Sequence, residues 1–277
     1  MQDLLPTDLF KGQTVFITGG GSGINFGVAE AFARHGASVA ICGRTREKLD
    51  KACENLEKLG AKTFAETADV RDYDALASAV EGAGKALGRV SHLVCGAAGN
   101  FLAPAENLSA GGFKAVVDID LIGSFNASRA AFAQLREGGG SILFISAGQA
   151  FVPYFAQAHA GAAKAGVDNL MQNLALEWGR FGIRSNSVAP GPIEGTEGMA
   201  RLAPGDEKFH SRFRASIPIG RYGTTDDIGQ AAVFLASPMA SFVTGTRLVV
   251  DGGMNLQGSG LLTSLVMSAG RSQAGNT

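Results

Sequence analysis

Several features that mark whole classes of proteins are missing from this 277-residue sequence. The formal net charge is −1 and no long run carries one sign of charge, which argues against a nucleic-acid surface or a polybasic membrane patch. No stretch reaches the roughly 20 apolar residues that cross a bilayer, and the acidic start MQDLLPTDLF lacks the basic and apolar regions of a signal peptide. The final residues GNT do not form a peroxisomal address. These absences predict a cytoplasmic protein that binds neither nucleic acid nor membrane.

Cysteine is rare, and metal-ligand patterns are missing. The three cysteines, Cys42, Cys53 and Cys95, are dispersed and odd in number, so we expect reduced core residues rather than a disulfide framework. The sequence has no zinc-ligand spacing, no G-x-S-x-G elbow and no Walker loop. Metal hydrolases, serine hydrolases and P-loop NTPases are therefore disfavoured, and no metal site is predicted.

The sequence does contain a regular alternation of short apolar runs and helical patterns, with glycines at the ends of the runs. The expected strands cover residues 13–18, 38–42, 62–66, 92–96, 141–146, 184–190 and 246–253. The expected helices cover residues 24–35, 46–59, 73–87, 112–136, 157–180 and 225–237. This order is typical of a parallel sheet covered on both faces. We therefore predict an α/β fold, a single doubly wound Rossmann-type domain over residues 1–277 with a seven-stranded parallel sheet.

Two segments do not fit this pattern. Residues 192–220 carry prolines, glycines and mixed charge between the sixth and seventh expected strands, which predicts a mobile flap over a substrate site. Residues 257–277 are expected to form a loosely held C-terminal tail.

The first expected strand runs into the glycine-rich turn TGGGSGIN, residues 18–25. Glycines let the backbone approach a pyrophosphate, whose charge is then stabilised by the N-terminus of the following helix. The spacing is G-x-x-x-G rather than G-x-G-x-x-G, so a plain tight turn is the alternative. We predict that the turn binds a dinucleotide through Gly19, Gly21, Ser22, Gly23 and Ile24.

Asn25 stands where the usual pattern has a third glycine, which permits close packing of the helix against the strand. Asparagine tolerates unusual backbone angles, and its amide can contact a phosphate. We expect a shifted helix start rather than a loss of binding.

The second expected strand indicates which coenzyme is preferred. An acid at its end would bind the adenosine ribose of NAD, but the sequence has Arg44 there and Arg46 two residues on. A guanidinium suits a 2′-phosphate, so NADP(H) is predicted, with a solvated arginine as the alternative. Asp69 and Val70 follow the third expected strand at the same edge, where Asp69 would accept from the adenine amino group or cap a helix.

Taken together, several motifs resemble the short-chain dehydrogenase/reductase family across residues 12–255. They are the glycine turn, GAAGN (96–100), the lysine helix HAGAAKAGVD (159–168), APGPI (189–193) and DGG (251–253). The resemblance implies a dimer or tetramer, of which we predict a homotetramer. It also implies a set of coenzyme contacts: Ala97, Ala98, Gly99, Lys164, Pro190, Gly191, Ile193 and Thr196.

The catalytic set that this resemblance implies is incomplete. Of the family's Asn, Ser, Tyr and Lys, only the lysine is present, as Lys164, while Ala160 holds the tyrosine position, Ala147 the serine position and Asp120 the asparagine position. Ser146 is next to the serine position and is expected to point elsewhere. A ketone reductase needs an acid beside the carbonyl oxygen, and two methyl groups cannot supply one.

Longer blocks are similar to 2,4-dienoyl-CoA reductases of the peroxisomal type, which lack this tyrosine and pair an aspartate with the lysine. The blocks are AAGNFLAPAENLS, DID (118–120), HAGAAKAGVD and APGPIEGTEGMARL. The mitochondrial type has a tyrosine fifteen residues before its lysine, where this chain has Gln149. The resemblance implies NADPH-dependent reduction of a 2,4-dienoyl-CoA to a 3-enoyl-CoA. Asp120 and Lys164 would be catalytic through a bound water. Asn100 and Phe101 are predicted to contact the acyl-CoA substrate, with support of the coenzyme or local turn bonding as the alternatives for the Asn100 amide.

Other interpretations stay open from the sequence alone. The chain would otherwise be a reductase of another enoyl- or ketoacyl-thioester, or an NADP-binding scaffold without catalysis, with Asp120 and Lys164 as a buried ion pair between helices. Tyr154 or His159 would be the acid if a ketone is reduced. The charged residues of the flap either meet CoA phosphates or are simply solvated: Arg201, Lys208, Arg212 and Arg214.

Overall fold

The computed structural model describes residues 5–202 and 206–259. Seven strands form one sheet, and every neighbouring pair is parallel. The strand order is β3-β2-β1-β4-β5-β6-β7. The strands are β1 (Thr14–Thr18), β2 (Ser38–Gly43), β3 (Thr63–Thr67), β4 (Val90–Cys95), β5 (Gly140–Ile145), β6 (Ile183–Pro190) and β7 (Arg247–Val250). The predicted α/β fold with a seven-stranded parallel sheet is confirmed.

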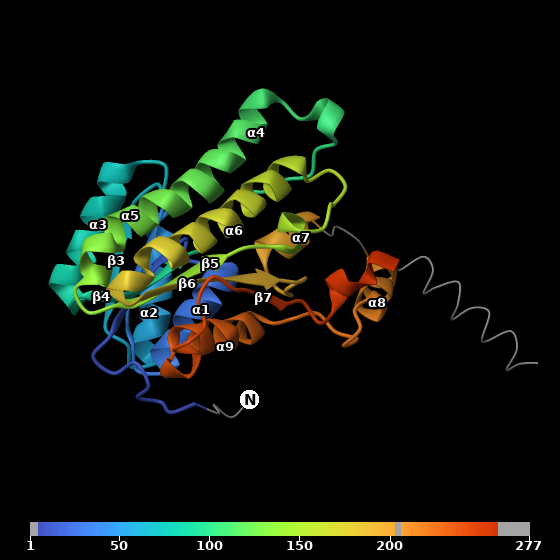
Figure 1. The fold of residues 1–277 in the computed structure, drawn as a ribbon. Coiled ribbons are helices and arrows are strands. Elements are labelled where there is room, and N and C mark those ends of the chain that lie inside the picture. The colour runs from blue at the N-terminus through green and yellow to red at the C-terminus, as the bar shows by residue number, and fades with distance from the viewer. Residues whose placement is uncertain (1–4, 203–205, 260–277) are drawn as a thin grey trace, which may run out of the picture.

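Helices cover both faces of the sheet because the side chains of each strand alternate between two cores. In β1, Val15 and Ile17 pack into one core and Phe16 into the other. The first core is covered by α1 (Gly23–Arg34), α2 (Arg46–Lys58) and α9 (Thr225–Ala236). The second is covered by α3 (Tyr73–Leu87), α5 (Gly123–Arg136) and α6 (Ala158–Trp178), and Figure 1 shows the two helical layers on opposite sides of the strands.

The helix expected over residues 112–136 is interrupted. The chain forms α4 (Ala110–Val117), then one π-helical segment, η2 (Asp118–Ile122), and then α5. A π-helical turn inside an α-helix is rare, and it is frequently located at a functional site. Here the interruption contains Asp120.

The segment between β6 and β7 contains two helices that the sequence analysis does not predict. They are α7 (Glu197–Leu202) and α8 (Glu207–Ser216). Glu197, at the start of α7, forms an ion pair with Lys48 of α2 at 2.8 Å. The interpretation of residues 192–220 as a substrate flap stays a prediction. Of the predicted tail, residues 257–259 belong to η6 (Met254–Ser259) and residues 260–277 lie outside the described residues.

Cys42 and Cys95 are buried in the second core, and burial raises the pKa of each thiol to about 12. All three cysteines are unpaired, as the sequence predicts. Within residues 5–202 and 206–259, no helix combines the length and the apolar character that crossing a bilayer requires.

The strand order places a reversal between β1 and β4. The chain winds outward through β2 and β3, then returns to β4 on the other side of β1. In an open parallel sheet, ligands bind in the crevice at the carboxyl ends of the strands beside such a reversal.

Candidate active site

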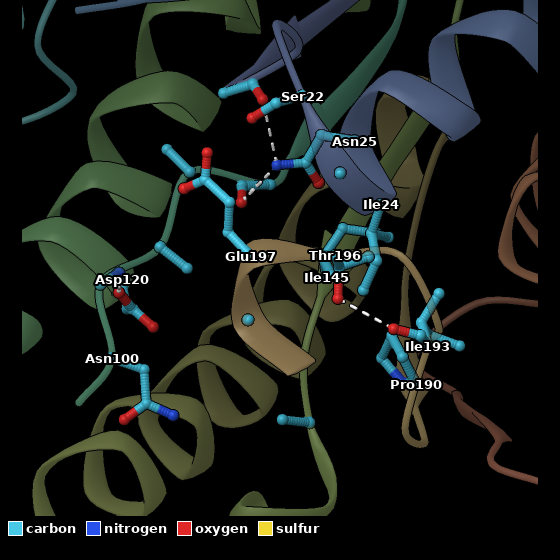
Figure 2. A pocket seen from close by; sticks show the side chains of 18 of the residues that line it. Ser22, Ile24, Asn25, Asn100, Asp120, Ile145, Pro190, Ile193, Thr196 and Glu197 are labelled. Atoms are coloured by element: carbon cyan, nitrogen blue, oxygen red, sulfur yellow. Dashed lines mark hydrogen bonds between the residues drawn. The ribbon is translucent and has the colours of Figure 1, made fainter. Parts of the chain in front are cut away.

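A cavity of about 820 Å³ opens at the carboxyl ends of the strands, on both sides of the reversal. Every sequence-predicted site residue except Phe101 lines it. These residues come from the ends of β1, β2, β3, β4 and β6 and the loops after them, from the start of α1, from η2 and from α6. Figure 2 shows Asp120 and Asn100 on one side of this pocket and Pro190 and Ile193 on the opposite side. Phe101 is 40% exposed and stacks on His159, with ring centroids 4.4 Å apart. Tertiary folding thus brings together residues that are up to 177 positions apart in the sequence, from Gly19 to Thr196 (196 − 19).

The loop after β1 has a backbone conformation that requires glycine. Gly19 has a φ of +70°, a conformation that favours glycine. A Cβ on Gly20 would come within 2.5 Å of the Ile41 side chain. Ser22 is the N-cap of α1, and its hydroxyl makes no capping hydrogen bond, so this hydroxyl and the first N–H groups of the helix are available to an anion.

The Asn25 amide binds backbone carbonyls, whereas the sequence suggested that it contacts a phosphate. Its Nδ2 donates to the carbonyl of Gly96 at 2.8 Å and to that of Gly19 at 3.3 Å, and both bonds are drawn in Figure 2. The helix begins at Gly23. The amide therefore joins the phosphate loop to the loop after β4 instead of pointing to a phosphate. Gly96 is required beside it, because a Cβ there would lie 2.2 Å from the Asn25 Oδ1.

One arginine that lines the cavity after β2 has no fixed partner among the described residues. Arg44 lines the cavity and is exposed, and it makes no hydrogen bond or ion pair with any described residue. Arg46 instead pairs with Asp50 at 2.8 Å and donates to the carbonyl of Ala65. A cationic group that is held in place only by solvent suits a phosphate ligand.

Asp69 is held by a neighbour in the same loop. Arg71 donates to both carboxylate oxygens, at 3.0 and 2.6 Å, and its guanidinium holds the pKa of Asp69 below its usual range. The helix-capping alternative is wrong, because Asp72 caps α3 by accepting from the N–H of Ala75. The ionised Asp69 still lines the cavity next to Val70.

Asp120 and Lys164 meet deep in the cavity wall. The Lys164 Nζ lies 3.2 Å from the Asp120 Oδ2 and donates to the carbonyl of Ile145 at 2.8 Å. The Asp120 Oδ1 accepts from the backbone N–H of Gly99 at 2.7 Å. Asp120 is 1% exposed. The pair therefore holds the loop after β4 and α6 in a fixed relation, and it lies where both groups reach the cavity.

The two positions from which a ketone reductase would take its acid and its carbonyl anchor contain methyl groups. Ala147 and Ala160 both line the cavity. Ser146 lines it as well, and its buried hydroxyl has no hydrogen-bond partner among the described residues. No proton donor has replaced the tyrosine at position 160.

Neither substitute acid is well suited to protonating a ketone. The Tyr154 hydroxyl donates to the Asn255 Oδ1 at 2.6 Å, and burial raises the pKa of Tyr154, so it holds its proton more tightly. His159 is fully buried, and burial lowers its pKa, which favours the neutral ring at neutral pH. Its two ring nitrogens have no hydrogen-bond partner within the described chain.

Gln157, which is the N-cap of α6, lines the cavity although no sequence motif assigns it a role. Gln149 also lines the cavity, and the sequence marks it only as a position without a tyrosine. The spacing of Gln157, seven residues before Lys164, was the available signal, because residues seven apart lie on one face of a helix.

The fold and the site together define a class of protein. A doubly wound parallel sheet, a glycine loop at a helix N-terminus and a long cavity across the strand-order reversal describe a dinucleotide-binding Rossmann protein. The family model described as "Enoyl-(Acyl carrier protein) reductase" matches residues 19–255. The chain belongs to the short-chain dehydrogenase/reductase family, whose members bind a nicotinamide coenzyme.

Several relatives of this chain have names that state a particular reaction. The chain is 45% identical to the peroxisomal 2,4-dienoyl-CoA reductase [(3E)-enoyl-CoA-producing] of Saccharomyces cerevisiae, over 89% of this chain and 85% of the relative. It is 46% identical to the enzyme of the same name from Rattus norvegicus, with the same coverage. Among solved structures, a gluconate 5-dehydrogenase from Burkholderia cenocepacia in complex with NADP and tartrate is 29% identical. That match has a TM-score of 0.83 and covers 90% of this chain and 98% of the other.

Proposed function

We propose that this protein uses NADPH to reduce 2,4-dienoyl-CoA thioesters to 3-enoyl-CoA products. The observation that carries the proposal is the set of side chains at the centre of the cavity. Methyl groups occupy positions 147 and 160, while a buried carboxylate and ammonium, Asp120 and Lys164, lie 3.2 Å apart. The relatives from Saccharomyces cerevisiae and Rattus norvegicus, which are 45% and 46% identical to this chain over the aligned residues, carry the name of this activity.

Conjugate reduction explains why no acid is needed at position 160. NADPH bound in the cavity would supply the hydride to the δ-carbon. Negative charge then spreads through the conjugated chain to the thioester oxygen, and a proton adds at the α-carbon, which leaves a double bond between the β- and γ-carbons. The protein must stabilise charge and deliver one proton at a distance from the hydride-accepting carbon.

Asp120 and Lys164 perform these two tasks in the proposal. The Asp120 Oδ1 accepts one hydrogen bond and the Oδ2 forms an ion pair with the Lys164 ammonium, and each carboxylate oxygen has room for a further hydrogen bond. Asp120 therefore orients the water that protonates the α-carbon. Lys164 has one N–H beyond those directed at Asp120 and at Ile145, and it binds the nicotinamide ribose through that group.

The remaining lining residues fit the coenzyme. Ser22 and the backbone of the glycine loop hold the pyrophosphate, and Arg44 meets the 2′-phosphate, which gives the preference for NADP(H). Pro190 and Ile193 lie opposite Asp120 (Figure 2), where they flank the nicotinamide. Thr196 donates to the carbonyl of Ile193 at 2.9 Å and supports this loop.

The CoA end of the substrate belongs to the flap in this proposal. Arg201 already pairs with Glu197, and Arg214 pairs with Glu207. Lys208 and Arg212 of α8 are exposed and have no ion pair in the described part of the chain. These two are the residues that we assign to the CoA phosphates.

A homotetramer in the cytoplasm completes the proposal. Apolar side chains are exposed on the outer faces of the helices and beyond α9: Phe113, Ile122, Phe125, Leu176 and Phe242. Such surfaces favour burial between subunits. The unpaired cysteines suit a reducing compartment.

The test is NADPH oxidation followed by absorbance, with a 2,4-dienoyl-CoA and a 3-ketoacyl-CoA in parallel. We expect turnover of the dienoyl thioester alone. Turnover of the ketone would refute the proposal and would make Tyr154 and His159 the residues to mutate. Tight NADPH binding with no turnover of either thioester would support a non-catalytic scaffold.

A further inference from the structure

Three amide side chains meet at the cavity wall beside Asp120. The Gln157 Oε1 accepts from the Asn100 Nδ2 at 2.9 Å and from the Gln149 Nε2 at 2.7 Å. An amide oxygen has two lone pairs, so these two bonds saturate it. The Gln157 Nε2 keeps both of its N–H groups, has no partner among the described residues, and belongs to a residue that lines the cavity.

The arrangement costs stability at two points. The Asn100 amide donates to Gln157 while its own Oδ1 stays buried without a partner among the described residues, which destabilises the folded state. Ala156, directly before Gln157, has a φ of +62° and is the one non-glycine residue with positive φ in the described chain. Strain of this kind persists where the surrounding structure enforces it, and it is concentrated at active sites. The cluster is therefore organised to aim the Gln157 amide rather than to stabilise the fold.

The position of Gln157 matches the chemistry of a conjugated substrate. It precedes Ala160, the position of the missing proton donor, by three residues, which is roughly 4.5 Å along a helix. In a 2,4-dienoyl thioester the δ-carbon is separated from the carbonyl carbon by four bonds, which is roughly 5 Å. A hydrogen-bond donor displaced by one helical turn thus suits hydride addition at the δ-carbon, whereas a ketone needs its acid at position 160.

We propose that the Gln157 Nε2 donates a hydrogen bond to the thioester carbonyl oxygen of the substrate, with Asn100 and Gln149 as positioning residues. This inference rests on the proposed function and names the group that holds its substrate. As hydride adds at the δ-carbon, the carbonyl π electrons move to the oxygen, and the Gln157 N–H stabilises the charge there. When a proton adds at the α-carbon, the C=O bond re-forms and Gln157 is unchanged.

The substitution Gln157→Glu tests the role of the Gln157 Nε2 N–H group alone. The carboxylate keeps an acceptor for both Asn100 and Gln149 but puts an oxygen where the proposal needs a donor. The matched control is Asn55→Asp on α2, where Lys58 donates to the amide oxygen at 3.2 Å and an acid keeps that bond. We expect Gln157→Glu to lower kcat/KM for a dienoyl-CoA by about 10²–10³, mostly through kcat. The Kd for NADPH should stay within about twofold of wild type, and Asn55→Asp should leave both quantities unchanged.

A spectrum gives a readout that needs no turnover. A hydrogen bond to the carbonyl oxygen polarises a conjugated thioester and shifts its absorption band to the red. We expect this shift when a dienoyl-CoA binds to the wild-type protein with NADP⁺, and its loss in Gln157→Glu. Gln149→Leu removes one of the two bonds that orient the amide, so it should keep a smaller shift and lose about tenfold in kcat.

The outcomes separate the inference from the proposed function. Dienoyl-CoA turnover with an unchanged red shift or unchanged kcat in Gln157→Glu would overturn the inference alone. A red shift that depends on Gln157 without turnover would overturn the proposed reaction and support the inference. Equal losses of NADPH affinity, folding stability and kcat in Gln157→Glu would show that Gln157 has a structural role, and they would overturn the inference. If the wild-type protein gave no red shift and no turnover, both the inference and the proposed function would be overturned.

Discussion

Asp120→Asn is the substitution that most directly tests the proposed proton delivery. Asparagine keeps an oxygen that can accept from the Gly99 N–H, which Asp120 now binds at 2.7 Å. It replaces the oxygen that lies 3.2 Å from the Lys164 Nζ with an NH₂ group. The change therefore leaves the loop after β4 attached and removes the negative charge that the lysine faces.

The expected magnitude follows from burial. The side chains of Asp120 and Lys164 are 1% and 10% exposed, and removing one partner of a buried ion pair costs roughly 3–5 kcal/mol. Because Lys164 retains the carbonyl of Ile145 and some solvent contact, we expect a loss of about 3 kcal/mol in the free energy of unfolding. Loss of an oriented proton donor costs about 10²–10⁴ in rate, so kcat for a dienoyl-CoA should fall at least about 100-fold. The NADPH Kd should rise by no more than about threefold.

The assays are urea unfolding, NADPH binding by fluorescence and dienoyl-CoA turnover. Asp118→Asn is the matched control, because Asp118 lies in the same π-helical segment and pairs with Lys114 on the exposed side. Exposed pairs contribute roughly 0–1 kcal/mol, so this variant should resemble the wild type in all three assays. Equal losses of turnover and NADPH affinity in Asp120→Asn, or loss of neither, would refute the role that we assign to Asp120.

Three further predictions concern the coenzyme and the core. Arg44→Ala should raise the Kd for NADPH about tenfold or more and leave that for NADH nearly unchanged; equal weakening of both in binding titrations would contradict the 2′-phosphate assignment. Gly96→Ala should strongly weaken NADPH binding because the new Cβ would lie 2.2 Å from the Asn25 Oδ1, and adding Asn25→Gly should restore much of it; a tolerated single variant would refute the steric argument. Burial lowers the pKa of His92 to about 3, so the unfolded chain binds an extra proton between about pH 6.5 and 3. The free energy of unfolding should therefore fall as pH decreases, by about 1.6 kcal/mol between pH 6.5 and 5. His92→Gln should lose this slope in urea unfolding curves measured across that range, and an unchanged slope would contradict the assignment.

The sequence was sufficient for the architecture because the fold depends on local patterns. Apolar strands alternate with helices, and that alternation predicted seven parallel strands and the position of the phosphate loop. Helix α3 lies over Tyr73–Leu87, where the apolar pattern predicted it. The interruption at Asp118–Ile122 was not predicted, because a π-helical turn changes the hydrogen-bond register without a distinctive residue pattern.

Site residues were predictable where a motif fixes both residue type and spacing. Lys164, Asp120 and the glycine loop all line the cavity. Asn25 was misjudged, because the partner of its amide is the carbonyl of Gly96, 71 residues along the chain. No local pattern in the sequence reveals such a contact.

The sequence by itself therefore determined the class of fold, the dinucleotide loop, and the absence of a tyrosine and a serine from the catalytic positions. Only the tertiary structure decided how the remaining polar groups are used. It placed Asp120 against Lys164 and bound the Gln157 amide oxygen, in the wall of the cavity, to Asn100 and Gln149. The physical reason is that hydrogen bonds between distant loops depend on the directions of side chains after the sheet has formed, and residue spacing along the chain does not specify those directions.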